Sequence, residues 1–418
     1  MSAAGTGSIL PMPVGCRALA ARIFYPKGQT SLANIRYLPQ LVTVMKTSNI
    51  LAGLSLVSFV SSAALAQSSV SVYGVADAAV ESASAKGATT GADISLTRLR
   101  SQGSYLGFRG TESLGGGLSA VFQLEGNYSI DTGESTFFNR DTFVGLRSSQ
   151  WGGVTLGVNT TPMRALGNSL DLTPGGNTGI GAIQSMLSIN RQSTGADNRR
   201  TDSARYRSPT FNGFSFDAVY GFGEQRDAIS GRNDNMLGAG VSYRNDKLMV
   251  GYAYDRQNDS NRTGLAQNDG VDTRHRLGAK YKVLPALELG AFYDTASSSG
   301  RFGPGAGTGK ISKDTWGLIG EWTSGQHEAY AMFVKSDAVD CTGTTTGNGV
   351  ACASAADTDA RMFTLGYNYN LSKRTMIRAA ISRIDNGRAA RYDFSNGTVG
   401  ATAGADVTGY SIGLRHRF

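Results

Sequence analysis

Long apolar runs are nearly absent from this chain of 418 residues. Only 40% of its residues are hydrophobic, and its mean hydropathy is −0.20. A helical membrane protein needs runs of about 20 apolar residues, so that class is excluded. The one mostly apolar run, 50–66, follows Lys46 and ends in the small-x-small segment 64–66. Residues 45–66 are therefore predicted to be a secretory signal peptide, and a buried helix near the terminus is the alternative.

Acidic residues are missing from the first 66 positions, which contain five basic residues. Residues 1–44 precede the predicted signal peptide, and a start codon assigned too far upstream or a long leader explains them. Removing 1–66 lowers the net charge from +8 to +3. The basic balance of the full chain therefore gives no reason to expect a nucleic-acid partner.

Cysteine is scarce, with three in the chain. After the leader only Cys341 and Cys352 remain, in a stretch rich in glycine, threonine and alanine. A signal peptide implies an oxidising compartment, so a disulfide that closes a small loop is predicted. Two free thiols in a flexible loop are the alternative.

Catalytic and metal-binding patterns are also lacking. His275, His327 and His416 are far apart in the sequence and show no metal-ligand spacing. No phosphate-binding loop or nucleophile elbow occurs. We therefore expect no metal, no cofactor and no enzymatic activity, and an outer-membrane hydrolase barrel remains a remote alternative.

The chain after Gln67 is instead rich in segments in which apolar and polar residues alternate, as in β-strands with two different faces. Sixteen such segments are predicted, and the count is even. They are 69–80, 101–111, 118–128, 139–147, 153–159, 203–208, 214–222, 236–244, 248–256, 273–283, 287–295, 315–323, 328–337, 361–370, 375–384 and 408–418.

The connections between these segments alternate strictly between short turns and long polar loops. Residues 160–202 form the longest loop, the third of the long ones. This alternation predicts an up-and-down meander with both termini at the short-turn end, as in outer-membrane barrels. Sixteen strands enclose more space than side chains can fill, so residues 67–418 are predicted to form an all-β, 16-stranded antiparallel transmembrane barrel around an aqueous channel. A soluble β-sandwich or solenoid is the alternative.

The last segment illustrates the two faces. Tyr410, Ile412 and Leu414 share one face with the terminal Phe418, whereas Ser411 and Arg415 lie on the other. We expect this strand to pair with 69–80, because a closed barrel leaves no open edge in the membrane.

Several short sequence motifs of the chain resemble those of the trimeric general porins of Gram-negative outer membranes. They include Ser71-Val72-Tyr73-Gly74, Leu106-Gly107-Phe108-Arg109-Gly110, Phe143-Val144-Gly145-Leu146, Ser208-Pro209-Thr210-Phe211-Asn212-Gly213-Phe214 and the closing Gly413-Leu414-Arg415-His416-Arg417-Phe418. The resemblance spans 67–418. It implies a cell outer-membrane location, a homotrimer, passage of small hydrophilic solutes and ions, contact with outer-membrane lipid and lipopolysaccharide, and Phe418 as part of the signal read by the assembly machinery.

The resemblance also implies that the third long loop folds inward and narrows the pore. Arg140, Arg207 and the loop residue Asp171 are similar to charged residues of the family's constriction. Strand parity adds Arg109 and Arg205 as residues that face water, since arginine on the lipid side would cost about 2–4 kcal/mol.

The chain departs from the family's charge pattern at several points, among them Asn177 in place of a further acid and Val158 in place of an arginine. Tyr105 stands where the family commonly has arginine, and a second loop acid expected after Pro174 is replaced by Gly175. With one loop acid missing, we expect a modest preference for anions. A channel specific for sugar or phosphate is the alternative, and saturable conductance would distinguish it.

Overall fold

The computed structural model describes residues 69–175, 179–189, 198–223, 234–258, 270–301, 308–343, 356–395 and 397–418. The signal peptide and upstream extension predicted for residues 1–66 lie outside these ranges. None of the helices in the described ranges is long and apolar enough to cross a membrane.

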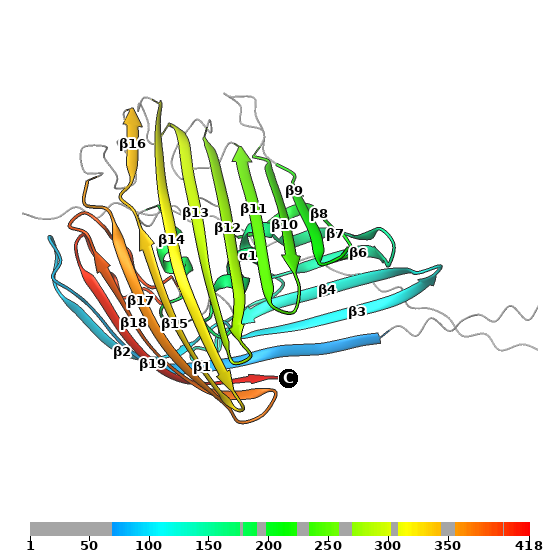
Figure 1. Cartoon of the computed structure of the whole chain (residues 1–418), viewed down its shortest axis with the longest axis horizontal. Helices are drawn as coiled ribbons and strands as arrows, with labels where there is room; N and C mark the ends of the chain where they lie inside the picture. Colours follow the sequence, from blue (N-terminus) through cyan, green and yellow to red (C-terminus); the bar gives the residue numbers. More distant parts are fainter. Residues whose placement is uncertain are drawn as a thin grey trace, which may run out of the picture. The chain divides into compact units, whose positions relative to one another are not determined.

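Antiparallel strands make up most of the described chain (Figure 1). In chain order they are β1 (Ser69–Lys86), β2 (Ile94–Ser101), β3 (Tyr105–Gly115), β4 (Leu118–Tyr128), β5 (Ser135–Thr136), β6 (Thr142–Ser148), β7 (Gly152–Thr160), β8 (Arg199–Arg207), β9 (Phe214–Gly221), β10 (Met236–Arg244), β11 (Leu248–Asn258), β12 (Val271–Leu284), β13 (Leu287–Arg301), β14 (Thr308–Ser324), β15 (His327–Ser336), β16 (Asp340–Gly343), β17 (Ala360–Asn370), β18 (Thr375–Asn386) and β19 (Asp406–Arg417).

These nineteen segments form a closed barrel of sixteen strands. The two numbers differ because three strands of the barrel are each interrupted and are therefore counted as two segments. Both β2 and β3 pair with β1, both β5 and β6 pair with β4, and both β15 and β16 pair with β14. Each remaining strand pairs with its neighbours in chain order, and β1 pairs with β19. The predicted 16-stranded antiparallel barrel, with alternating short turns and long loops, is confirmed.

The closure involves the chain's last residue. The backbones of Phe418 and Gly74 exchange two hydrogen bonds of 3.1 Å each. A Cβ atom on Gly74 would lie 2.5 Å from Cζ of Phe418, so glycine leaves the space that the phenyl ring needs. The predicted pairing of the last strand with the first is therefore observed down to the terminal residue.

Several strands extend further toward the long loops than predicted. The segment 287–295 was expected to end at Thr295, but β13 continues to Arg301, and β14 begins at Thr308 rather than Thr315. Serines 297, 298 and 299 continue the ladder opposite β14. Backbone hydrogen bonds sustain a ladder whatever the side chains, so polar residues do not mark the strand's end.

Alternate side chains face opposite sides of the barrel wall. Leu365 and Ile412 are 60% and 59% exposed on the outer surface, whereas Asp294 on an inward position is fully buried. Valine, leucine and aromatic residues dominate the outward positions, as expected for a surface in contact with hydrocarbon.

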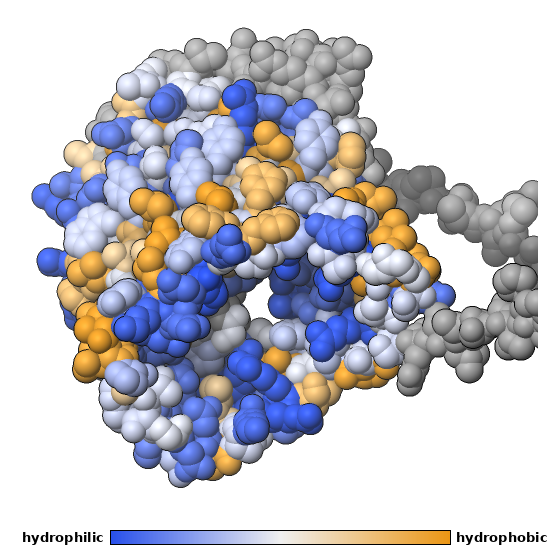
Figure 2. Space-filling view, turned by 45° about the vertical axis from the view of Figure 1, so that its right-hand side comes forward, coloured by the Kyte–Doolittle hydropathy of each residue, from blue (hydrophilic) through white to orange (hydrophobic). Residues whose placement is uncertain are grey.

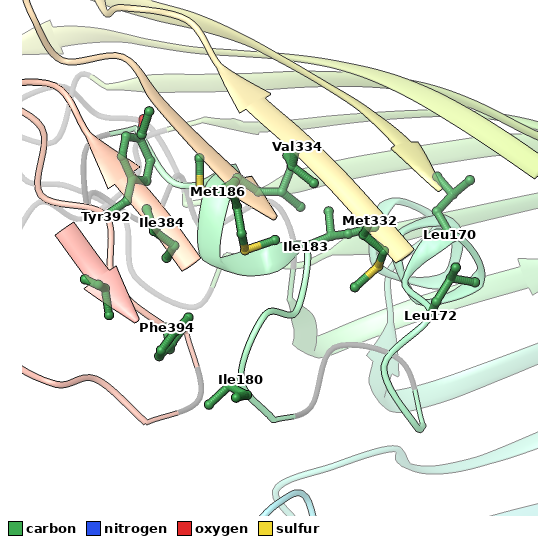
Figure 3. Packing of buried hydrophobic residues seen from close by; sticks show 14 of the residues in the cluster. Leu170, Leu172, Ile180, Ile183, Met186, Met332, Val334, Ile384, Tyr392 and Phe394 are labelled. Atoms are coloured by element: carbon green, nitrogen blue, oxygen red, sulfur yellow. The ribbon is translucent and has the colours of Figure 1, made fainter. Parts of the chain in front are cut away.

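The third loop connects β7 and β8, and its described parts, residues 161–175 and 179–189, fold inward and contain two helices. These are α1 (Pro162–Leu170) and α2 (Gln184–Leu187). Apolar residues of the loop, among them Leu170, Ile183 and Met186, pack against inward residues of β15 and β18 such as Met332 and Ile384 (Figure 3). Residues 387–405, here called the eighth loop, join this core through Tyr392 and Phe394.

Inward glycines make room for α1 on the barrel wall. A Cβ atom on Gly251 would lie 2.6 Å from Cδ1 of Leu166, and one on Gly278 would lie 2.5 Å from Cδ1 of Leu170. The helix therefore lies directly on β11 and β12, and any larger residue at these glycines would displace it.

Candidate pore constriction

The third loop covers one side of the barrel interior. Helix α1 packs on β9 to β13, and α2 contacts β15 and β17. The inner wall from β3 to β8 has no comparable helix against it among the described residues. Figure 2 shows an opening bordered mostly by hydrophilic residues. We call β10 to β19 the packed side. We call β3 to β9 the open side.

Basic residues of the packed side hold the loop by its backbone carbonyl groups. The buried Arg276 donates to the Met163 carbonyl oxygen at 3.1 Å. Lys313, also buried, donates to the carbonyl oxygens of Met186 and Ser188 at 2.6 Å each. These carbonyl groups lie at the C-terminal end of α2, where they have no hydrogen-bond partner within the helix. The Lys313 ammonium group supplies that partner.

A second buried network holds the loop near Pro174. Asp77 on β1 accepts from Arg378 at 2.6 Å and from Arg415 at 2.7 Å. Arg415 also donates to the Pro174 carbonyl oxygen at 3.2 Å. The inward charge of the last strand therefore positions the third loop.

Asp171 is likewise engaged within the loop. One carboxylate oxygen accepts from the backbone N–H and hydroxyl of Thr173 at 2.9 and 2.6 Å, and the other accepts from the Ile183 N–H at 2.8 Å. The side chain is buried. The carboxylate therefore closes the loop on itself, and its predicted role in lining the pore stays a prediction.

The first cluster on the open side joins two arginine–tyrosine pairs around one carboxylate. Cζ of Arg109 lies 4.8 Å from the ring centre of Tyr73, and Cζ of Arg140 lies 4.3 Å from that of Tyr105. Glu125 accepts from the Tyr73 hydroxyl at 3.0 Å and forms an ion pair with Arg140. Tyr105 stands at a position where the family commonly has arginine. Its ring lies under the guanidinium group of Arg140 and helps to hold that group in position.

A second cluster contains residues that the sequence analysis did not single out. Arg199, the first residue of β8, pairs with Asp141 at 3.0 Å. It also lies within electrostatic reach of Arg140 on the wall and Arg164 on α1. The Arg199-Arg200 doublet just before the predicted strand 203–208 was the available signal.

Arg205 and Arg207 lie closer to the short-turn end, at the end of β8. Asp217 on β9 accepts from Arg205 at 2.9 and 2.5 Å, and its nearer oxygen is 3.7 Å from Arg207. The Arg207 side chain is 58% exposed, against 9% for Arg205.

The predicted site residues thus fall into three places. Tyr105, Arg109 and Arg140 form one cluster, Arg205 and Arg207 lie nearer the short turns, and Asp171 lies inside the third loop. Their roles in the pore stay predictions. Cys341 is disulfide-bonded, and its predicted partner Cys352 lies outside the described residues.

Comparisons with known proteins agree with this architecture. A family described as Gram-negative porin matches residues 52–389. The chain is 30% identical to outer membrane porin protein 32 of Delftia acidovorans, over 86% of this chain and 96% of that protein. An anion-selective porin from Comamonas acidovorans has a similar structure, with a TM-score of 0.69 and 26% identity over 84% of this chain and 100% of that one.

A more distant structural match has the same fold. It is the trimer form of OmpT, an outer membrane protein of Vibrio cholerae, with a TM-score of 0.60 and 17% identity over 84% of this chain and 99% of that one. The inward third loop, the sixteen closed strands and the matched family lead to one conclusion. The chain belongs to the Gram-negative porin family and is an outer-membrane porin.

Proposed function

We propose that this porin forms a water-filled channel for passive diffusion of small hydrophilic solutes and ions and that it prefers anions. The observation that carries the proposal is the group of three arginines, Arg140, Arg164 and Arg199, beside the two carboxylates of Glu125 and Asp141. Arg140 and Arg199 come from the barrel wall, and Arg164 comes from α1 of the inward loop.

The physical basis is the field inside a narrow, water-filled gap with low-dielectric walls. Such walls focus the field, so an excess of positive charge raises the local concentration of anions. The Asp171 carboxylate is buried within the third loop, so it opposes this effect less than an acid exposed to the passage would. The anion selectivity of the Comamonas relative points the same way.

Reversal potentials in a KCl gradient across planar bilayers test the preference. We expect the wild-type protein to favour chloride and the Arg140→Gln/Arg199→Gln variant to lose most of that preference. Arg256→Gln, at an exposed outward position of β11, serves as the control and should behave like wild type. A potassium-selective wild type would overturn the proposal, as would a double variant with an unchanged permeability ratio.

We further propose that three copies associate through the outer faces of β1, β6 and β7. These faces carry exposed valine and leucine, such as Val72 and Val144. The exposed tyrosines lie on β9 to β19, where lipid and lipopolysaccharide would contact the barrel, whereas Trp151 is exposed in the turn between β6 and β7. In native membranes, a thiol-specific cross-linker should join Val144→Cys protomers and not Leu318→Cys protomers. Equal cross-linking of both variants would refute this arrangement.

Phe418 is proposed as part of the signal for outer-membrane assembly. Its ring is 45% exposed on the outer surface, while its backbone completes the β1–β19 ladder. Deleting Phe418 should reduce the yield of assembled protein far more than the conductance of each assembled pore. A normal yield of trimers from the deletion variant would contradict this role.

The proposed function needs no cofactor, catalytic residue or nucleic-acid partner. No group of three or more His, Cys, Asp or Glu side chains suited to a metal ion occurs in the part of the chain that the structure describes.

A further inference from the structure

A recess of about 380 Å³ lies on the open wall between the arginine cluster and the periplasmic turns. Its lining includes Arg147 on β6, Gly153 and Thr155 on β7, and Arg205 and Arg207 on β8. We call it the basic recess. It belongs to the inner wall, because Val144, Leu146 and Val154, next to these positions, are exposed on the outer surface.

The strand register places two arginines on either side of a glycine. Arg147 is opposite Gly153, and Gly153 is opposite Arg207. Two strand spacings separate the arginine backbones by about 10 Å, which lets both guanidinium groups reach a small ion above Gly153. A Cβ atom on Gly153 would lie 2.9 Å from Cγ of Arg147, so the Arg147 side chain already leans over the glycine.

The two acids near these arginines, Asp217 and Asp141, are shared with other partners. Arg147 is exposed and has no ion pair among the described residues. The carboxylate nearest to Arg207, that of Asp217, accepts two hydrogen bonds from Arg205. Asp141, the other acid lining the recess, is bound by Arg199 and by the Thr160 hydroxyl.

We propose that the basic recess binds the oxyanion group of a permeating solute, a phosphate or a carboxylate, in a second station beyond the constriction. Arginine presents paired N–H donors that match two oxygens of one oxyanion, whereas chloride offers a single atom. The recess therefore retains oxyanions longer than chloride. This inference rests on the proposed anion preference, because the solute must also pass the arginine cluster.

Titration of single-channel chloride current with inorganic phosphate tests the recess. In about 0.1 M KCl, where charges act over about 10 Å, we expect saturable block, half-maximal at about 1–10 mM phosphate. Phosphate is added to each side in turn, and acetate replaces it in a parallel series. Block by both ions indicates recognition of any oxyanion, and block by phosphate alone narrows the site to phosphate.

Two variants separate the recess from the rest of the pore. Arg147→Gln/Arg207→Gln removes the donors and should weaken the block by about tenfold, or about 1.4 kcal/mol. Gly153→Val keeps every charge but fills the space between the arginines, so it should weaken the block to a similar extent. Arg256→Gln is the control and should leave the block unchanged.

The outcomes are distinguishable from those of the proposed function. Chloride current that is insensitive to both oxyanions in the wild-type channel would overturn the inference while leaving the anion preference intact. Block that persists in both recess variants would also overturn it. A potassium-selective wild-type channel that still shows phosphate block removed by these variants would refute the anion preference alone.

Discussion

The porin contains the same charged arrangement twice, once on each side of its interior. Arg274 and Arg276 on β12 share Asp294 on β13, with ion-pair distances of 3.3 and 2.8 Å. Arg205 and Arg207 on β8 share Asp217 on β9, at 2.5 and 3.7 Å. In each case the second arginine is directly opposite the aspartate in the strand register.

The third loop gives the two arrangements different roles. On the packed side all three side chains are at most 3% exposed, and the arginines also donate to the carbonyl oxygens of Leu187 and Met163. On the open side Arg207 remains mostly in water. An inward arginine thus holds the loop where the loop covers it, whereas Arg207, which the loop does not cover, stays exposed.

Replacing the shared aspartate should give the largest difference in unfolding free energy between the two sides. Asp294→Asn removes the carboxylate that two buried guanidinium groups share and should destabilise the folded barrel by about 3–5 kcal/mol. Asp217→Asn, the matched variant, should cost less, about 1–3 kcal/mol, because Asp217 is partly exposed and Arg207 lies mostly in water. Urea unfolding of the two purified proteins in detergent measures both. Equal losses would mean that burial does not distinguish the two sites.

Loosening the apolar contacts of the packed side should have the next largest effect. Leu170, the last residue of α1, is 1% exposed and packs against Gly278 of β12. We therefore expect Leu170→Ala to lower the free energy of unfolding by about 3 kcal/mol. We also expect noisier single-channel current, because α1 is held less firmly. Leu277→Ala, at an outward position of β12 that is 53% exposed, is the matched control. A quiet channel of unchanged stability from Leu170→Ala would argue against the loop as a packed element.

The sequence was sufficient for the barrel but not for the division of its interior. Period-2 alternation and turn chemistry predicted sixteen strands and the inward face of Arg207, because both depend on local geometry. Which inward arginines the loop would cover depends on packing between distant segments. Asp171 shows the same limit, since its hydrogen bond to Ile183 requires the folded loop.

One sequence signal could have indicated the packed side. Gly251 and Gly278 occupy inward positions of β11 and β12, where a wide channel needs no small residue. Each receives a leucine of α1. Inward glycines on neighbouring strands therefore mark the place where a segment lies against the wall.

Asp217→Asn should also change the ion selectivity of the channel. Asp217→Asn removes the only acid that pairs with Arg205 and Arg207 among the described residues, so the preference for chloride over potassium should rise about threefold, or about 0.65 kcal/mol. The reversal potential in a KCl gradient measures the change. Asp294→Asn protein that still assembles should show a smaller shift, because its charge is buried under the loop. A larger shift from Asp294 would reverse the assignment of the two sides.

Salt should weaken the contribution of the open side and leave that of the packed side nearly unchanged. Raising KCl from about 0.1 M to 1 M shortens the distance over which charges act from about 10 Å to about 3 Å, and the chloride preference should fall about twofold. The stability lost in Asp294→Asn should stay nearly constant over the same range, since counterions do not reach a fully buried group. Reversal potentials and urea unfolding at each salt concentration check both halves. If the Asp294→Asn penalty also declines with salt, ions reach the packed side, and the two arrangements differ only in degree.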